Sequence, residues 1–392
     1  MLSWCENLED EALNQAKNLA AHPVTAHHVA LMPDAHVGYG MPIGGVIACR
    51  DALIPNAVGV DIGCGMVAVK TQLDEKSLGG PQAIRSILDD IKKRIPMKEG
   101  RSHNTPQPWE GFKKFYDSFK TQPPPWAPEN KQTHDKKNLG TLGGGNHFIE
   151  LQASEEGYVW LMIHSGSRNL GHRIAQHYHA RAQELNRSEG ITLPHEDLAF
   201  LPAQSEDGKG YIRAMNFALS YALENRRVMM EHFKEVLIKH CPSTQILDEI
   251  NIHHNYAALE EHFGEKLWVH RKGATSAKEG EWGIIPGSMG TSSYIVQGKG
   301  HQDSLMSCSH GAGRKMGRMQ ACRKLNLEEC TQAMEGIVHD SWKTNKYRKK
   351  NAGQFDLSEA PLAYKNIDEV IEAELDLIEP KVKLRPLGVL KG

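Results

Sequence analysis

The chain of 392 residues lacks the sequence signatures of the most familiar nucleotide-dependent and metal-dependent enzymes. It contains no GxxxxGK[ST] phosphate-binding loop, no GxGxxG dinucleotide fingerprint and no HExxH zinc helix. It also lacks a Lys-x-Asp-Gly sequence, the motif that supplies the nucleophilic lysine in one large class of nucleotidyltransferases. A covalent nucleotidyl intermediate on this chain would therefore need a carrier other than a lysine in that setting.

The features of secreted and membrane proteins are missing as well. The seven cysteines form no CxxC pair and no dense framework, which favours a reducing compartment over a disulfide scaffold. The N-terminus is polar and acidic, unlike a signal peptide, and no apolar run reaches the roughly 18 residues of a membrane span. We therefore expect a cytoplasmic protein that makes no contact with a membrane.

Net charge is also nearly absent, because the formal charge is only −2. A polyanion would have to be held by a local basic patch, since the chain as a whole does not attract phosphate. Apolar residues make up 40% of the chain and charged residues 24%, which is ordinary for a globular protein with a substantial core.

The pattern of apolar residues and glycines predicts one large α+β domain. Apolar runs alternate with glycine clusters over residues 29–70, which indicates strands joined by tight turns. The polar, proline-rich segment 98–137 predicts a long loop or lid insertion. Apolar periodicity predicts a strand over 158–163 and helices over 81–95, 170–185, 212–238 and 367–377. No repeat or clean linker divides residues 1–392, which favours a single α+β domain over a doubly wound sheet.

Histidine is abundant, with 21 copies, and several copies lie beside glycine rather than inside apolar runs. His147 follows three glycines and precedes Glu150, His164 ends a strand-like run, and His253-His254 adds two more imidazoles, of which we expect one to face a site. Asp61-x-x-Cys64 occupies a glycine-flanked turn. Taken singly, such a histidine is more often a hydrogen-bonded structural residue than a ligand, and Cys64 could equally be a plain buried cysteine. Together they would form a mixed nitrogen, oxygen and sulfur set able to hold one or two transition metals.

The segment Ser309-His310-Gly311-Ala312-Gly313-Arg314 places a histidine among small residues. Small neighbours let a phosphate approach the imidazole, and a neutral imidazole can attack phosphorus. The basic residues after it could neutralise phosphates or an RNA backbone; they are Arg314, Lys315, Arg318, Arg323 and Lys324. The alternative interpretation of this segment is a helix N-terminus with a solvated basic face.

Seven motifs in this chain resemble, in order, the signatures of the RtcB family of RNA ligases. They are Met32-Pro33-Asp34-Ala35-His36-x-Gly38, Val58-Gly59-Val60-Asp61-Ile62-Gly63-Cys64-Gly65-Met66, Gly140-Thr141-Leu142-Gly143-x-Gly145-Asn146-His147-Phe148-Ile149-Glu150, His164-Ser165-Gly166-Ser167-Arg168, His254-Asn255, Pro286-Gly287-Ser288-Met289-Gly290 and Ser309-His310-Gly311-Ala312-Gly313-Arg314. The resemblance extends from about Val29 to the last two residues. It implies mixed β-sheets flanked by helices around a central metal cleft.

The resemblance also implies roles for individual residues. In the family, two Mn²⁺ ions are bound with the cysteine thiolate between them. The residues of this chain that match those metal ligands are Asp61, Cys64, His147, His164 and His254. His310 matches the histidine that is guanylylated by GTP, and Asp34, which we also expect to be catalytic, matches a residue close to the metals, as does His36. The guanylate pocket matches Asn146, His147, Phe148, Ile149, Glu150, His254, Asn255, Pro286, Gly287, Ser288, Met289, Ser293, His310, Gly311, Ala312, Gly313, Tyr364 and Lys391. Within that pocket, Glu150 and Lys391 match the residues that recognise guanine, and Tyr364 is expected to stack near the base.

The resemblance implies joining of an RNA end bearing a 2′,3′-cyclic phosphate or 3′-phosphate to a 5′-hydroxyl end, through an RNA(3′)pp(5′)G intermediate. Such chemistry serves tRNA splicing or RNA repair, and an archease-like activator is a possible partner. Two other functions fit a metal site: a metal-dependent phosphodiesterase that opens cyclic phosphates without ligation, and a non-catalytic RNA-binding subunit. The hydrolase has no need of His310 or Lys391 as parts of a guanylate site.

Overall fold

Two β-sheets of different size form the framework in the computed structural model of the chain, which describes residues 1–119, 123–344 and 355–392. The larger sheet has the strand order β13-β14-β17-β6-β7-β5-β9, and β16 pairs with β17. Its strands are β5 (Gly65–Asp74), β6 (Phe148–Ser154), β7 (Tyr158–Ser165), β9 (Ile246–His253), β13 (Trp282–Ile285), β14 (Ser293–Gly298), β16 (Val338–His339) and β17 (Ile378–Lys391). The smaller sheet has the order β1-β2-β3-β11-β10. Its strands are β1 (Leu2–Ser3), β2 (Thr25–His36), β3 (Ile43–Cys49), β10 (Asn255–His262) and β11 (Glu265–Lys272).

Two short strand pairs complete the β structure. They are β4 (Ala52–Leu53) with β8 (Leu201–Pro202), and β12 (Ala274–Ser276) with β15 (Ser307–Ser309). The α-helices are α1 (Asp10–Ala20), α2 (Pro55–Val58), α3 (Pro81–Arg94), α4 (Glu110–Asp117), α5 (Glu129–Asn138), α6 (Arg168–Ser188), α7 (Glu206–His240), α8 (Arg318–Lys324), α9 (Leu327–Gln332) and α10 (Ile367–Glu372). The described chain therefore has the predicted α+β architecture, with helices flanking mixed sheets.

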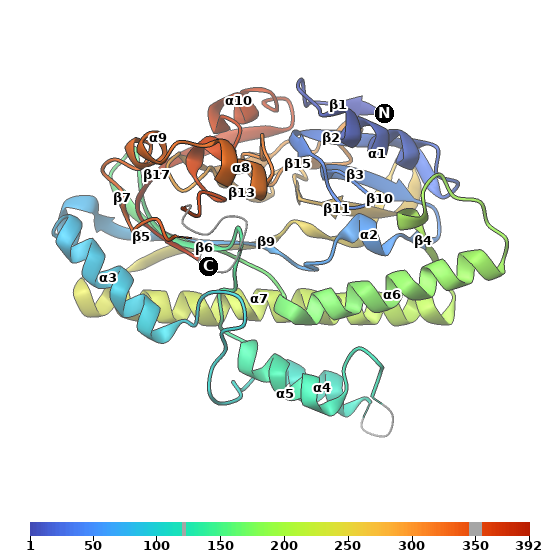
Figure 1. The fold of residues 1–392 in the computed structure, drawn as a ribbon, viewed down its shortest axis with the longest axis horizontal. Helices are drawn as coiled ribbons and strands as arrows, with labels where there is room; N and C mark the ends of the chain where they lie inside the picture. Colours follow the sequence, from blue (N-terminus) through green and yellow to red (C-terminus); the bar gives the residue numbers. More distant parts are fainter. Residues whose placement is uncertain (120–122, 345–354) are drawn as a thin grey trace.

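Successive side chains of a strand point to opposite faces of its sheet, and on β5 the side chains of both faces are buried. On β5, Val67 and Val69 pack with α3 and α7 residues in one core cluster. Met66 and Ala68 of the same strand pack in another cluster with residues such as Ile284 of β13. Figure 1 shows α7 running beneath the sheets for much of the length of the molecule, with α6 beside it. The apolar alternation of β5 thus places this strand in the middle of the molecule.

Most of the predicted elements are confirmed. The strands and turns of 29–70, the strand at 158–163 and the helices at 81–95, 170–185 and 212–238 are all present, the last as part of the 35-residue helix α7. The helix predicted over 367–377 is shorter, because α10 ends at Glu372. Among the described residues, no helix combines the length and apolar character required to cross a membrane.

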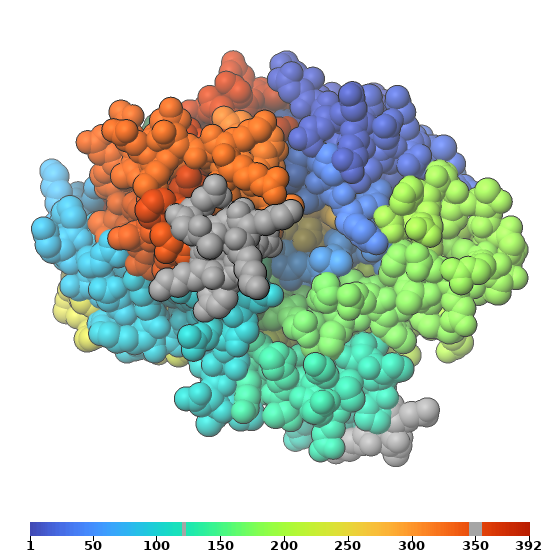
Figure 2. All heavy atoms as spheres, viewed as in Figure 1, coloured from blue at the N-terminus to red at the C-terminus, as the bar shows by residue number. Residues whose placement is uncertain are grey.

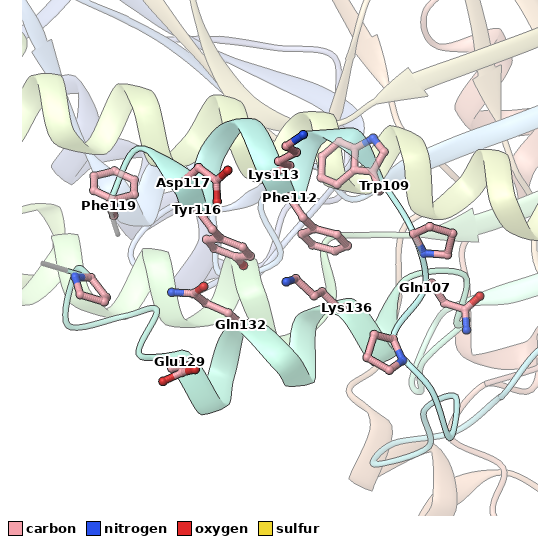
Figure 3. A pocket seen from close by; sticks show the side chains of 13 residues that line it. Gln107, Trp109, Phe112, Lys113, Tyr116, Asp117, Phe119, Glu129, Gln132 and Lys136 are labelled. Atoms are coloured by element: carbon pink, nitrogen blue, oxygen red, sulfur yellow. The ribbon is translucent and has the colours of Figure 1, made fainter. Parts of the chain in front are cut away.

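The prediction of a long loop over 98–137 is wrong for α4 and most of α5, which lie inside it, whereas the other described residues of the segment are not helical; residues 120–122 lie outside the described residues. Its prolines lie outside the helices, where their effect on helical structure is small. Phe115 of α4 stacks on Phe217 of α7 with ring centroids 3.8 Å apart, and this contact anchors the segment. A cavity of about 620 Å³ lies between α4 and α5 (Figure 3). The described residues that line this cavity include none of the residues that the sequence predicted for the active site.

Candidate active site

Four strand ends of the larger sheet meet at one edge and carry the predicted metal ligands. Strands β6, β7, β5 and β9 are antiparallel neighbours, so the start of one lies beside the end of the next. Their register pairs Phe148 with His164, Met66 with His164, and Gly65 with His253. The residues at or next to these strand ends therefore come together, although the positions from Asp61 to His254 span almost 200 residues of the chain.

The donor atoms of these residues are within contact distance. Cys64 Sγ lies 3.5 Å from His147 Nε2 and 3.2 Å from His164 Nε2. His164 Nε2 lies 3.3 Å from His254 Nε2, and Asp61 Oδ2 lies 3.1 Å from His147 Nε2. All five predicted metal ligands are thus brought together, and three of them alone (Cys64, His147 and His164) form a buried group that could hold a metal ion.

Outer hydrogen bonds orient the two central imidazoles. His147 Nδ1 lies 2.9 Å from the Leu142 carbonyl oxygen, and His164 Nδ1 lies 3.2 Å from the Asn146 carbonyl oxygen. Because a carbonyl only accepts, His164 Nδ1 carries the proton and His164 Nε2 presents a lone pair to the cluster. His164 Nε2 faces Cys64 Sγ and His254 Nε2, so a cation bound here would have a sulfur and two imidazole nitrogens as donors. The donor set therefore fits a transition-metal site.

The protonation states agree with this arrangement. Burial, with the neighbouring histidines, lowers the pKa of His164 and His254 well below the usual value, so both imidazoles are neutral at pH 7. Burial opposes ionisation of Asp61, yet its hydrogen bond to His147 holds its pKa below the ordinary value. In the metal-free state burial raises the pKa of Cys64, whose proton a bound metal would displace.

His253 faces away from the cluster, as predicted for one of the adjacent pair. Its Nδ1 lies 3.0 Å from the Gly63 carbonyl oxygen. Arg226, which is fully buried, donates to that same oxygen and to the Ser165 carbonyl oxygen at 2.9 and 2.8 Å. Arg226 therefore ties the turn that carries Cys64 to the strand end that carries His164. No motif in the sequence marked Arg226 for this role.

His310 approaches these five candidate metal ligands, called the metal cluster below, from the smaller sheet's side. It follows β15, and its ring centroid lies 4.9 Å from that of His254. Asp34 Oδ2, on β2, accepts hydrogen bonds from His310 Nδ1 at 2.5 Å and from the His310 backbone N–H at 3.1 Å. Asp34 is fully buried; burial opposes its ionisation, but His310 holds its pKa below the usual value. The ionised carboxylate thus holds the proton on Nδ1 and leaves Nε2 as the free nitrogen.

A cavity of about 350 Å³ opens beside His310 and His164. The predicted pocket residues that line it are Asn146, Phe148, Pro286, Gly287, Ser288, Met289, His310, Gly311, Ala312, Gly313, Tyr364 and Lys391. Other lining residues come from both ends of the chain, for example His36 and Arg318. Figure 2 shows the surface hollowed between the N-terminal region in blue and the C-terminal region in orange.

Some predicted pocket residues do not line this cavity. His147 and His254 belong to the metal cluster, and Ile149 packs in the core. Asn255 is used to hold backbone, because its amide donates to the Asp61 carbonyl oxygen at 3.1 Å and accepts from the Gly273 N–H at 2.7 Å. Glu150 and Ser293 are also outside the cavity lining, and Gln152 Nε2 donates to both, at 2.7 and 3.1 Å.

Burial raises the pKa of Glu150 to about 7, against the lowering effect of Lys391. Lys391 Nζ lies 3.7 Å from Glu359 Oε2, and Glu359 also pairs with Arg314 and Arg318. Burial disfavours the charged form of Glu359, but these three cations hold its pKa at about 2. Glu359 therefore organises the basic residues at this wall, and sequence reasoning missed it because no motif surrounds it.

Comparisons with known proteins agree with this geometry. The family model described as tRNA-splicing ligase RtcB matches residues 15–392. The chain is 39% identical to the RNA-splicing ligase RtcB of Escherichia coli K12, with 98% of this chain and 95% of that protein covered. It is 32% identical to the tRNA-splicing ligase RtcB of Archaeoglobus fulgidus and 30% identical to that of Thermococcus kodakarensis, each with 98% of this chain and 92% of the relative covered. The chain therefore belongs to the RtcB family of RNA ligases.

Proposed function

We propose that this RNA ligase joins a 2′,3′-cyclic phosphate or 3′-phosphate RNA end to a 5′-hydroxyl RNA end, with GTP and Mn²⁺, through guanylylated His310. The observation that supports the proposal is the Asp34–His310 pair, which lies next to a cluster that could hold a metal ion and beside a cavity. A cluster alone would suit a hydrolase. An imidazole with one nitrogen fixed by a carboxylate and the other free suits a covalent carrier.

In the first step, His310 Nε2 attacks the α-phosphorus of GTP. A nitrogen–phosphorus bond forms, the bond to the β-phosphate oxygen breaks, and pyrophosphate leaves with that electron pair. Asp34 retains the Nδ1 proton in a charge-assisted hydrogen bond and stabilises the positive charge that develops on the ring. The product is a guanylylated histidine.

The guanylate then passes to RNA. A cyclic phosphate end is first hydrolysed to a 3′-phosphate, whose oxygen attacks the phosphorus on His310 and releases the imidazole. The resulting RNA(3′)pp(5′)G is attacked by the 5′-hydroxyl at the RNA-side phosphorus, and GMP leaves. A 3′,5′ linkage results, and the hydroxyl proton passes to solvent.

Two Mn²⁺ ions would be held by Asp61, Cys64, His147, His164 and His254. When bound, the metal supplies positive charge next to the reacting phosphates. The guanylate would occupy the cavity beside His310, with Glu150 and Lys391 toward the base and Tyr364 near it. The polar lining at Ser288 and the small residues after His310 leave room for the phosphate.

Arg168 and Arg314 are our candidates for holding RNA phosphates. Arg168 Nη1 lies 3.3 Å from His147 Nδ1, and the buried Nε of Arg168 has no hydrogen-bond partner among the described residues. Arg314 is held at the cavity by Glu359 and by Tyr364 Oη. Splicing of tRNA and repair of cleaved RNA both fit this chemistry, and we propose a cytoplasmic location and an archease-like activator.

Labelling with α-³²P-GTP in the presence of Mn²⁺ tests the proposal. The native protein is expected to retain acid-labile label, and His310→Ala is expected to abolish it, whereas a matched change of the buried structural histidine, His270→Ala, should leave labelling in place. A cleaved stem-loop with cyclic phosphate and 5′-hydroxyl ends should then be joined only by the labelling-competent protein. Opening of the cyclic phosphate without labelling or joining would identify a hydrolase, and RNA binding that survives chelation and Cys64→Ala without any product would identify a binding subunit.

A further inference from the structure

Two residues outside the sequence motifs contact the backbone on either side of the Asp34–His310 pair. They are Lys365 and Glu374, which precede and follow the short helix α10. Within the described part of the chain, no hydrogen bond joins either residue to the metal cluster, and Glu374 does not line the cavity beside His310. Their contacts nevertheless converge on the two residues that the proposed chemistry requires to be in register.

Lys365 holds the strand segment that carries Asp34. Its Nζ donates to the Pro33 carbonyl oxygen at 3.0 Å and to the Ala35 carbonyl oxygen at 2.8 Å. These are the two carbonyls that flank Asp34 along the chain. The Lys365 backbone N–H also donates to the Gly313 carbonyl oxygen at 3.0 Å. One residue thus connects the Asp34 segment with the loop that follows His310.

Glu374 holds the strand that carries His310. Its side chain is fully buried, and Oε2 accepts the Ser309 backbone N–H at 2.8 Å. Burial, reinforced by the negative charge of Asp34, raises the pKa of Glu374 well above its usual value. Glu374 is therefore a neutral carboxylic acid at pH 7, able to accept one hydrogen bond and donate another. The buried hydroxyl of Ser309 has no hydrogen-bond partner among the described residues, and neither has Glu374 Oε1.

The two contacts restrain both partners of a short bond. Asp34 Oδ2 can accept from the His310 ring and from the His310 backbone only while β2 and β15 keep their relative positions. Lys365 fixes one of these strands around residue 34, and Glu374 fixes the other at residue 309. Misplacement of a reacting group by about 1 Å can lower a rate by about a hundredfold, so such restraint has a measurable effect.

We propose that Lys365 and Glu374 are positioning residues that hold Asp34 and His310 in register for attack on the nucleotide. The test of this proposal by labelling rate rests on the proposed function, because it requires guanylylation of His310. The test by crystal structures of variants does not. Neither residue contacts the reacting atoms. A positioning role predicts that the rate of His310 labelling falls while the affinity for GTP remains close to native.

The test compares three variants and one matched control variant with the native protein. Lys365→Met and Glu374→Leu remove the contacts and keep similar side-chain size, and each is expected to lower the single-turnover labelling rate by about tenfold to a hundredfold. Equilibrium binding of GTP should change by less than about threefold, because ground-state binding does not need the aligned nucleophile. Glu374→Gln should restore at least about half of the native rate, because an amide accepts and donates like the neutral acid. Glu372→Leu, at the exposed end of α10, is the matched control and should label normally.

Crystal structures of the variants provide the second measurement. The Asp34–His310 bond is expected to lengthen in Lys365→Met and Glu374→Leu, and to persist in Glu374→Gln. Native labelling rates in both contact-removing variants, or an unchanged Asp34–His310 distance, would overturn the positioning role. Absence of labelling in the native protein would instead overturn the proposed function, and the distances would still decide this inference. If Glu374→Leu does not fold, Lys365→Met and Glu374→Gln give the answer.

Discussion

At the scale of single residues, burial assigns different roles to chemically similar groups. Asp34 is buried but ionised, because two hydrogen bonds from His310 stabilise its charge. Glu374 is equally buried but neutral, because burial and the nearby negative charge of Asp34 raise its pKa. Carboxyl groups whose environments separate their pKa values in this way can take different roles in one site. No sequence pattern distinguishes these two carboxyl groups.

Glu150 gives a pH-dependent prediction at this scale. Burial raises its pKa in the folded chain to about 7, from an ordinary value of 4.5. Between these values the folded protein holds a proton that the unfolded chain releases, so the free energy of unfolding declines as pH rises from 4.5 to about 7 and is unaffected above that. The contribution is roughly 3 kcal/mol, since one pKa unit corresponds to about 1.4 kcal/mol. Glu150→Gln should remove this decline.

Denaturant unfolding of native protein and variant between about pH 4.5 and pH 8 measures the difference. Glu155→Gln is the matched control, because Glu155 is exposed on the same hairpin, after β6. Parallel stability profiles for the native protein and Glu150→Gln would show that the folded state does not perturb this carboxyl group.

At the scale of elements, the turn after His310 determines how closely that segment can approach the end of β2. Gly313 has φ +71°, and a Cβ at this position would lie 2.3 Å from the Asp34 carbonyl oxygen. The loop after His310 therefore packs directly on the end of β2. A side chain here would separate the two elements that the Asp34–His310 bond joins.

We expect Gly313→Ala to abolish most His310 labelling and to destabilise the fold. Gly336→Ala is a closely matched control, because Gly336 has φ +79° but open space around its Cβ position. Both variants incur the backbone cost of about 1–2 kcal/mol for a left-handed residue with a side chain. Only Gly313→Ala adds the clash, so equal labelling by the two variants would argue against the close approach as the reason for this glycine.

The segment 98–137 shows the limit of local patterns at this scale. Its prolines predicted a loop, but Pro128 is the N-cap of α5 and the other prolines lie between helices. Phe112 and Tyr116, four residues apart, lie on the face of α4 that packs in the core with α7. Tertiary packing of this face, rather than composition, produces the helices.

At the scale of the whole molecule, the metal cluster joins distant parts of the larger sheet. Its proposed ligands come from the turn before β5, the start of β6, the end of β7 and the turn after β9. A metal that binds only the folded chain stabilises it by about 2.7 kcal/mol at a free concentration 100 times the dissociation constant. Metal binding should therefore raise the melting temperature, and chelation should reverse the increase.

Differential scanning fluorimetry with and without Mn²⁺ measures this effect. Cys64→Ala should eliminate the metal-dependent increase, whereas Cys330→Ala, which alters another buried cysteine in a different core cluster, should retain it. A similar increase in both variants would mean that the metal stabilises the protein from another position.

The sequence by itself determined the identity of the family, the α+β class and the residue types of the metal cluster and of His310, because these depend on motifs that are local in the chain. Only the tertiary structure decided that Asp34 binds the ring of His310, 276 positions away, and that Asn255 and Ile149 do not line the cavity. It alone also gave roles to Arg226, Glu359, Lys365 and Glu374. The physical reason is that strand register and burial set both the distances between such groups and their charge, and neither quantity is encoded by neighbouring residues.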